Sequence, residues 1–318
     1  PMTSLEYSYT AWISHNKNTI AEMKRLEEEN NRLFIDAYGL QDELTPHVPI
    51  DEITLTVNPA YRYGAKLSEE EQWTRFRHDT MEELVSYAIG CIMGRYSLDK
   101  PGLILANAGD SIQDYFTEVP EPRFMPDEDG ILPVTAQDDF EDDLPSLVKK
   151  FIRVAFPVEH YDENIRFLEE GLGKNIKSYI LRDFYKSHVK TYKTRPIYWM
   201  VSSPPGAFRC LIYLHRYTQD TVGTIMGSYL RPYRNKLEVR RQQNRHIIDS
   251  PSRKTAEKTT AQKRLDEITR VLQELEQWER EVVYPLAQER VALDLDDGVK
   301  VNYGKLGAIL ENVKGLNA

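Results

Sequence analysis

The sequence contains little cysteine and no long apolar run. Cys91 and Cys210 are the only two cysteines among 318 residues, which is too few for a disulfide framework or a cysteine-rich zinc site and favours a reducing compartment. No apolar run approaches the roughly 18 residues of a membrane-spanning helix. The first residues also lack the basic-then-apolar pattern of a secretory signal. We therefore expect a cytoplasmic protein with no membrane partner.

The motifs of several common enzyme classes are missing too. No GxGxxG, HExxH or GxSxG sequence occurs. The sequence GLGK at Gly171–Lys174 lacks the earlier glycine and the following Ser or Thr of a phosphate-binding P-loop, and it is predicted to end a helix. No catalytic, cofactor-binding or metal-binding residue is therefore predicted in this chain.

Composition and length indicate a folded protein of one or two domains. The chain is 41% hydrophobic and 29% charged, as ordinary globular proteins are. Its net charge of −9 disfavours a general nucleic-acid binder. That average conceals a strong charge asymmetry along the chain.

The segment Arg195–Tyr217 predicts a β-hairpin around which the rest is organised. Pro196–Val201 and Phe208–Leu214 are rich in aromatic and β-branched residues, and Ser202–Gly206 between them has turn-forming Ser, Pro and Gly. Long helical patterns on both sides indicate a small sheet with helices packed around it. Charged side chains stand at the ends of the hairpin: Arg195, Arg209, His215 and Arg216.

Apolar spacing of three and four predicts most of the remaining elements as helices. We expect an irregular start over Pro1–Thr10 and a short strand over Ile53–Val57. Gly39 is expected to cap the first helix, and Ser68 with Glu71 forms a capping-box pattern. The predicted helices before the hairpin are His15–Tyr38, Ser68–Tyr96, Leu144–Val154, Asp162–Glu170 and Lys174–His188.

Pro101–Pro145 is strongly acidic and is predicted to be a surface loop or lobe. Between Asp114 and Asp143 there are eleven acidic residues against Arg123 alone. Five prolines between Pro120 and Pro145 disfavour a long regular element. A solvated face is the favoured interpretation, because the sequence DEDG from Asp127 lacks the spaced ligands of a calcium-binding loop.

After the hairpin, Asp220–Asn244 and Lys254–Gln288 predict an antiparallel helix pair with a break at Asp249–Ser252. Eleven basic residues against three acidic ones between Arg231 and Arg264 give a net charge of +8. Only Glu238 lies among the six cations of the first helix, so we expect them to be unpaired. An anionic partner, or the chain's own acidic segment folding back, would relieve their repulsion. Leu293–Tyr303 predicts a turn with strand-like flanks, and 305–313 a short final helix.

Asn58–Tyr61 has the sequence NPAY. It differs only at its third position from the Asn-Pro-Pro-Tyr loop with which adenine methyltransferases bind a flipped base. Without a glycine-rich cofactor motif upstream, it is interpreted as a turn. His215 could serve as a general base, but no partner for it is evident and a structural role is favoured.

Several stretches resemble the C-terminal third of PglX (also called BrxX), the adenine-specific DNA methyltransferase of type 1 BREX phage-defence systems. In order, they are Glu22–Leu40, Glu52–Gly64, Ser86–Asn107, Phe124–Pro133, Arg195–Ser203, Leu211–Val222 and Tyr284–Lys305. The family's cofactor motif, catalytic loop and methyltransferase core have no counterpart here, and Ser4–Trp12 matches poorly. The resemblance implies a C-terminal piece, or a separately encoded half, of such an enzyme. S-adenosylmethionine would bind the parent enzyme's core, and this chain alone is expected neither to bind it nor to methylate DNA.

The sequence thus predicts an α+β protein, mostly helical, with a small hairpin-centred sheet and a C-terminal antiparallel helical hairpin. The expected parts are a linking helix (1–44), an α+β domain (45–230) and a basic helical hairpin with a tail (231–318). Double-stranded DNA and the methyltransferase core are the expected partners. A module that docks other BREX components is the alternative, and a stand-alone nuclease lacks a supporting Asp…Glu-x-Lys pattern. The candidate DNA-binding residues are Lys186, Lys190, Lys193, Arg195, His215, Arg216, Arg231, Arg234, Lys236, Arg240, Arg241 and Arg245.

Overall fold

The computed structural model describes residues 3–64, 66–137 and 139–316. It is 62% helical with one small three-stranded antiparallel sheet, which confirms the predicted fold class. Asp138 of the acidic segment lies outside the described residues, as do Pro1 and Met2 of the predicted irregular start. Within the described ranges, no helix has the length and apolarity to cross a membrane. The chain divides into two compact units, one of residues 1–85 with 152–175 and one of residues 86–151 with 176 onward.

The first unit is helical. Segments written η are short 3-10 or π-helical segments. Its elements are α1 (Leu5–Tyr38), η1 (Ile50–Glu52), α2 (Pro59–Tyr63), the first part of α3 (Glu69–Ile92), the end of α5 (Leu144–Ala155), η2 (Val158–His160) and α6 (Tyr161–Leu172). Aromatic side chains contact one another across its helices, with Trp12 stacked on Phe76 at 5.5 Å and Tyr9 5.7 Å from Phe167.

Helix α1 begins at Leu5, ten residues before the predicted start, so the expected irregular start is wrong from that residue onward. The Ser4 side chain accepts a hydrogen bond from the Tyr7 amide, and the Leu5 amide donates to Asn164 Oδ1 at 2.8 Å. These contacts satisfy amides that a helix start leaves unpaired. Gly39 ends the helix with φ of 67°, as predicted.

The strand predicted at Ile53–Val57 is wrong, because this part of the chain folds into turns around Asn58. The Asn58 side-chain Nδ2 donates to the carbonyls of Ile50 and Ile53 at 2.7 and 2.9 Å, and its Oδ1 accepts from the Ala60 backbone amide. The NPAY sequence is therefore a helix-capping turn, as interpreted. The capping box of α3 is present as predicted, with Ser68 and Glu71 each bonding the other's amide.

The second unit contains the sheet and the helical hairpin. Besides most of α5 and the end of α3, its elements before the hairpin loop are α4 (Ile112–Glu118), β1 (Ile131–Pro133), α7 (Ile176–Tyr179), η3 (Ile180–Phe184), α8 (Tyr185–Thr191) and β2 (Tyr198–Ser202). The later ones are β3 (Arg209–Tyr213), η4 (Leu214–Arg216), α9 (Thr221–Thr224), η5 (Ile225–Leu230), α10 (Arg231–Asp249), α11 (Thr255–Trp278), η6 (Glu279–Val283), α12 (Tyr284–Glu289), η7 (Leu295–Asp297) and α13 (Val299–Lys305).

The sheet has the order β1-β3-β2, so the predicted hairpin β2–β3 supplies two of its three strands. Ile212 of β3 is paired with Trp199 on one side and with Ile131 on the other. Strand β1 lies inside the acidic segment and is buried, which corrects the prediction of a surface loop there. A three-residue strand ending in proline gives too short a pattern to be detected from sequence.

The C-terminal predictions are wrong in secondary structure. The flanks of Gly298, expected to be strand-like, are η7 and α13, and α13 ends where a final helix was expected to begin. The chain then runs beside β2, because the Ser202 amide donates to the Ile309 carbonyl at 2.9 Å and the Glu311 amide to the Met200 carbonyl at 2.8 Å. Long-range backbone pairing thus replaces the local helix.

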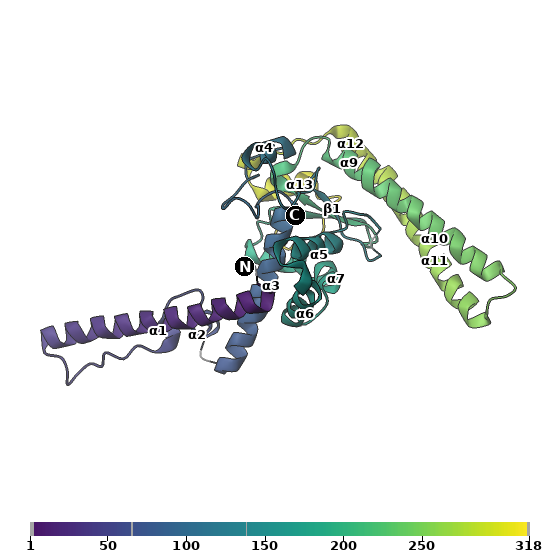
Figure 1. Ribbon diagram of the computed structural model, residues 1–318. Coiled ribbons are helices and arrows are strands. Elements are labelled where there is room, and N and C mark those ends of the chain that lie inside the picture. The colour runs from purple at the N-terminus through teal and green to yellow at the C-terminus, as the bar shows by residue number, and fades with distance from the viewer. Residues whose placement is uncertain (1–2, 65, 138, 317–318) are drawn as a thin grey trace. The chain divides into compact units, whose positions relative to one another are not determined.

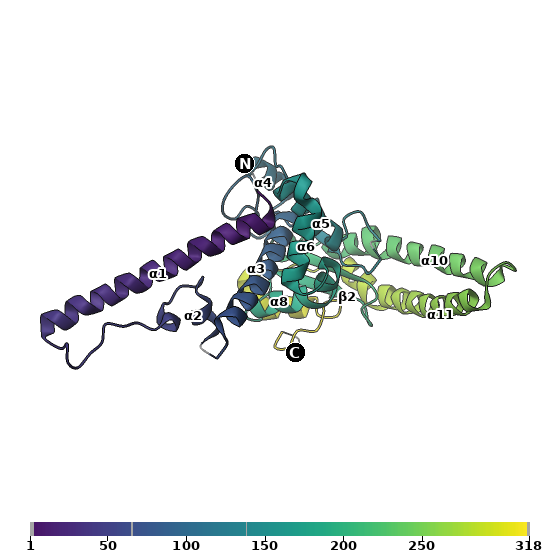
Figure 2. The same cartoon turned by 60° about the horizontal axis from the view of Figure 1, so that its bottom comes forward.

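Helices α10 and α11 form the predicted antiparallel hairpin, which we call the arm. Both views show the two helices side by side along their lengths, joined at one end by a turn (Figures 1 and 2). At the other end each helix passes into a π turn, η5 before α10 and η6 after α11. Leu237, Ala261 and Leu275 are buried along the arm, as the apolar spacing requires.

Candidate nucleic-acid interface

Two of the predicted DNA-binding arginines are paired at the base of the arm. Arg231 Nε lies 2.7 Å from Glu279 Oε1, and Arg234 Nη1 lies 2.6 Å from Glu279 Oε2. The Glu279 side chain is only 10% exposed, so both bonds are partly shielded from solvent. The expectation of unpaired cations is therefore wrong at these positions, because the counter-charge comes from η6, far away in sequence.

The acidic segment pairs with the next part of the arm. Arg240 bonds the carboxylate of Asp139, whose side chain is 1% exposed. The ammonium of Lys236 lies 4.4 Å from the centre of the Phe140 ring, a cation–π contact. Arg241 is paired within its own helix, with Nη2 2.7 Å from Glu238 Oε1. The fold-back of the acidic segment, weighed as an alternative from the sequence, is therefore present here.

Arg216, predicted to lie at the hairpin end and contact DNA, is buried instead. It is 6% exposed, and its guanidinium donates to the carbonyls of Asp127 at 2.8 Å, Met93 at 3.4 Å and Glu128. These bonds hold the turn that precedes β1. Gly130 in that turn has φ of +72°, and a Cβ there would lie 3.3 Å from the Arg216 side chain. Arg216 therefore stabilises the fold and is not accessible to a ligand.

His215 is half-buried beside Tyr213, with ring centres 5.2 Å apart. Burial, and secondarily the nearby Arg95 charge, lower the pKa of His215, and Asp110 opposes them. The imidazole is therefore neutral at pH 7 and offers no positive charge to a phosphate. This agrees with a structural role.

The remaining predicted residues are exposed and have no ion-pair partner in the described part of the chain. They are Lys186, Lys190, Lys193, Arg195 and Arg245. The first two lie on α8, and the next two in the turn between α8 and β2. The structure thus places four of the free cations on α8 and in the turn that follows it, while Arg245 lies on the arm.

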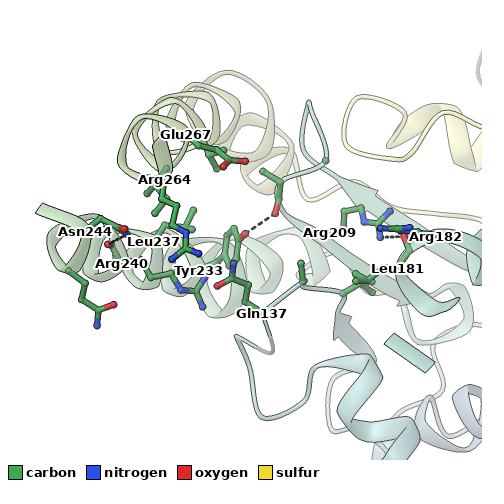
Figure 3. Close-up of a pocket in the computed structure, with 17 residues that line it drawn as sticks. Gln137, Leu181, Arg182, Arg209, Tyr233, Leu237, Arg240, Asn244, Arg264 and Glu267 are labelled. Atoms are coloured by element: carbon green, nitrogen blue, oxygen red, sulfur yellow. Dashed lines mark hydrogen bonds between the residues drawn. The ribbon is translucent and has the colours of Figure 1, made fainter. Parts of the chain in front are cut away.

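A groove of about 820 Å³ lies between the arm and the sheet (Figure 3). Four arginines from separate elements line it, and Glu267 is the one acidic residue among the described lining residues: Arg182 of η3, Arg209 of β3, Arg240 of α10 and Arg264 of α11. Apolar side chains, among them Leu237 and Ile268, also line it, together with the amides of Gln137, Gln243 and Asn244.

The groove arginines differ in how many hydrogen bonds and ion pairs they already make within the protein. Arg209 donates to the Leu181 carbonyl at 2.6 Å and lies 3.9 Å from Glu311. Arg182 and Arg264 are exposed and have no ion pair with any described residue. A smaller adjoining cavity shares Arg182 and Arg209 and adds Lys186 together with the acidic Asp183 and Glu311. Basic side chains therefore reach α8 from the groove, with two acidic residues among them.

Arg182, Arg209 and Arg264 were not among the predicted site residues. Their charge was visible, but they are far apart in the sequence and lie on three different elements. The signal for Arg264 was its position at the end of the basic run, directly across the arm from α10. Nothing local distinguished Arg182 from other surface arginines.

One set of side chains in the described residues has the spacing of a metal site, His78, Asp79 and Glu82 on α3. Asp79 is already engaged, since it accepts from the Tyr63 hydroxyl at 2.7 Å and lies 3.3 Å from Arg62. Asp127 and Asp129, considered from the sequence as cation ligands, accept from the amides of Gly130 and Ile131. Neither set offers a ligand cage.

Comparison with known proteins relates this chain to adenine-specific methyltransferases, although no family model matches it. It is 34% identical over 98% of its length to the adenine-specific methyltransferase BrxX of Escherichia coli O9:H4 (strain HS). It is 33% identical over 96% of its length to the adenine-specific methyltransferase PglX of Lacticaseibacillus casei (strain Zhang). The chain covers only 27% and 24% of these relatives. It is therefore homologous to a region of the BrxX and PglX methyltransferases, which confirms the resemblance stated from the sequence.

Proposed function

We propose that this chain is the DNA-engaging portion of a BREX-type adenine-specific DNA methyltransferase that marks host DNA in phage defence. The observation that carries the proposal is the groove, in which four arginines converge from the arm and the sheet. Clustered guanidinium groups bind phosphates in bidentate fashion, and the counterions they release favour association. The homology to adenine-specific methyltransferases makes DNA the expected polyanion.

In this proposal the exposed cations hold the DNA backbone and the groove's amides lie beside it. Arg182, Arg264, Lys186 and Arg245 are free of ion pairs with described residues, so a phosphate would not have to displace a carboxylate from them. Catalysis and S-adenosylmethionine binding belong to the methyltransferase core, on the same polypeptide or on another chain. Work on host DNA makes the cytoplasm the expected location. Phosphate contacts position the protein without reading sequence, so binding by this chain should vary little between DNA sequences.

A salt titration of duplex binding tests the proposal. Fluorescence anisotropy with a labelled 30-base-pair duplex would compare the unaltered chain with the double variant Arg182→Glu and Arg264→Glu. Loss of two phosphate contacts should lower the slope of log Kobs against log[salt] by about 1.8, at about 0.9 per contact. Both residues are exposed, so melting temperature should move little.

The matched control reverses two exposed arginines of the other unit, Arg32→Glu with Arg166→Glu. This variant has the same change in net charge, and neither residue has an ion pair with a described residue. It should leave the slope unchanged. Equal losses in the two variants would mean that net charge alone governs binding, and the groove would then not be the DNA site.

Docking to other proteins is a second candidate function, favoured by the surface of α1. Leu33, Phe34 and Tyr38 are 65%, 57% and 74% exposed, and Leu26 is 47% exposed. At helical spacing these residues share one side of α1 and form an apolar stripe that solvent does not favour. A partner would be the rest of the methyltransferase or another BREX component. Replacing Leu33 and Phe34 by Glu should abolish such docking without changing the salt dependence of DNA binding.

A further inference from the structure

The acidic segment contacts η5 and α10 through residues that lie on one helical face. Tyr229, Lys236 and Arg240 are separated by seven and four residues, which places them along the same side of the helix. The Tyr229 hydroxyl lies 2.9 Å from Asp129 Oδ2 and 3.1 Å from Asp142 Oδ2. Lys236 contacts Phe140 and Arg240 contacts Asp139, as described above. Residues 139–142 therefore lie against this helical face, beside Asp129, and we call residues 139–142 the strap.

Arg240 is the point where this strap meets the groove. Its side chain is 27% exposed and lines the groove (Figure 3). Its Nη2 bonds Asp139 Oδ1. The other oxygen of Asp139, Oδ2, is buried and has no hydrogen-bond partner among the described residues. The Asp139 amide donates to Thr135 Oγ1 at 3.1 Å. Within the described residues, the one cation that pairs with this buried carboxylate is thus a groove arginine.

We infer that the strap is an internal competitor for the groove's anionic ligand, with Asp139 holding Arg240 as a phosphate oxygen would. This inference rests on the proposed function, since it assumes that the groove binds DNA phosphates. A carboxylate and a phosphate both accept charge-assisted hydrogen bonds from a guanidinium. Arg240 cannot serve both fully, because a phosphate that takes it leaves Asp139 buried without its counter-charge.

The groove arginines differ in whether the strap must move before they can bind a phosphate. Arg182 and Arg264 are free to receive the first phosphates, whereas Arg240 becomes available only when Asp139 leaves it or adjusts around it. DNA binding through the full set of arginines is therefore coupled to movement of the strap. Relief of the strap, for instance by another part of the enzyme that binds the acidic side chains, would strengthen DNA binding without any new contact to DNA.

A double-mutant cycle of Asp139→Asn and Arg240→Gln tests the inference, with duplex affinity and its salt dependence as the readout. Asparagine keeps the volume of Asp139 and removes its charge. If Arg240 then gains one phosphate contact, the salt slope steepens by about 0.9, which corresponds to about eightfold tighter binding at 0.1 M salt. In the Arg240→Gln background the same change at Asp139 should have no effect, because the residue it releases is absent.

Two results of the cycle would overturn the inference alone. Asp139→Asn that leaves affinity unchanged would mean that the strap does not compete, and an equal gain in both backgrounds would mean a general charge effect. Glu267→Gln provides the control for such an effect, since Glu267 lines the groove and forms no ion pair with a described residue. If neither the unaltered chain nor Asp139→Asn binds DNA, the proposed function fails and the inference fails with it. Failure of the cycle alone leaves the proposed function intact.

Hydrogen exchange on the unaltered chain decides the question if Asp139→Asn does not fold. The Thr135 amide donates to Asp143 Oδ1 at 2.9 Å and the Asp139 amide to Thr135, so both report on the seated strap. Addition of DNA should speed their exchange if DNA displaces the strap. Unchanged or slower exchange at saturating DNA would overturn the inference.

Discussion

Replacement of Arg216 by Met tests whether this arginine stabilises the fold or contacts DNA. The Arg216 guanidinium donates to three backbone carbonyls, those of Met93, Asp127 and Glu128, and is 6% exposed. A hydrogen bond from a charged group contributes about 1.5–3 kcal/mol, and methionine preserves much of the packing of the aliphatic stem. Release of a buried cation from an apolar setting offsets part of the loss. We expect the free energy of unfolding to fall by about 3 kcal/mol.

Urea unfolding followed by tryptophan fluorescence measures this loss as a lower midpoint at constant slope. Arg195→Met is the control, because Arg195 is exposed and unpaired among the described residues and its replacement should change stability by less than about 0.5 kcal/mol. The two variants should rank in the opposite order for DNA affinity after correction for unfolded chain. An Arg216→Met protein that is as stable as the original but defective in DNA binding would refute the structural role.

Three further predictions concern buried and absent groups. Burial, with the Asp129 charge second, raises the pKa of Asp127 to about 7. The folded chain therefore retains a proton that the unfolded chain releases, and stability falls as pH rises from about 4 to 7. Asp127→Asn should remove this fall and raise stability at pH 8 by about 2–4 kcal/mol, measured by urea midpoints at pH 5 and 8. Cys91 and Cys210 are buried and reduced, and burial raises the pKa of both thiols, so a thiol reagent should label them only after denaturation. Calorimetry with S-adenosylmethionine should detect no binding to the chain alone.

Elements with strong local signals were predictable from the sequence. Two apolar runs around a turn predicted the hairpin β2–β3, and the Ser68–Glu71 capping box predicted the start of α3. The arm followed from its apolar spacing and the break near Ser250. In each case the residues that decide the structure are neighbours in the sequence, so a short window contains the whole cause.

Long-range pairing explains what the sequence could not reveal. Arg231 and Arg234 look unpaired in the sequence because their partner Glu279 lies on η6, 48 and 45 residues away along the chain. Arg240 and Asp139 are 101 residues apart. No charge pattern within α10 indicates which of its cations are neutralised. The groove was missed for the same reason, because its arginines come together only after the arm packs beside the sheet.

The strand order also affects how the chain folds during its synthesis. Ile131 of β1 pairs with Ile212 of β3, so β1 has no partner until some 80 further residues have been synthesised. At about 5–20 residues per second, that interval is about 4–16 s on the ribosome. The aspartates and prolines around β1 are poor partners for aggregation. The acidic residues of this segment thus protect the nascent chain from aggregation during the time in which the apolar strand β1 has no partner strand.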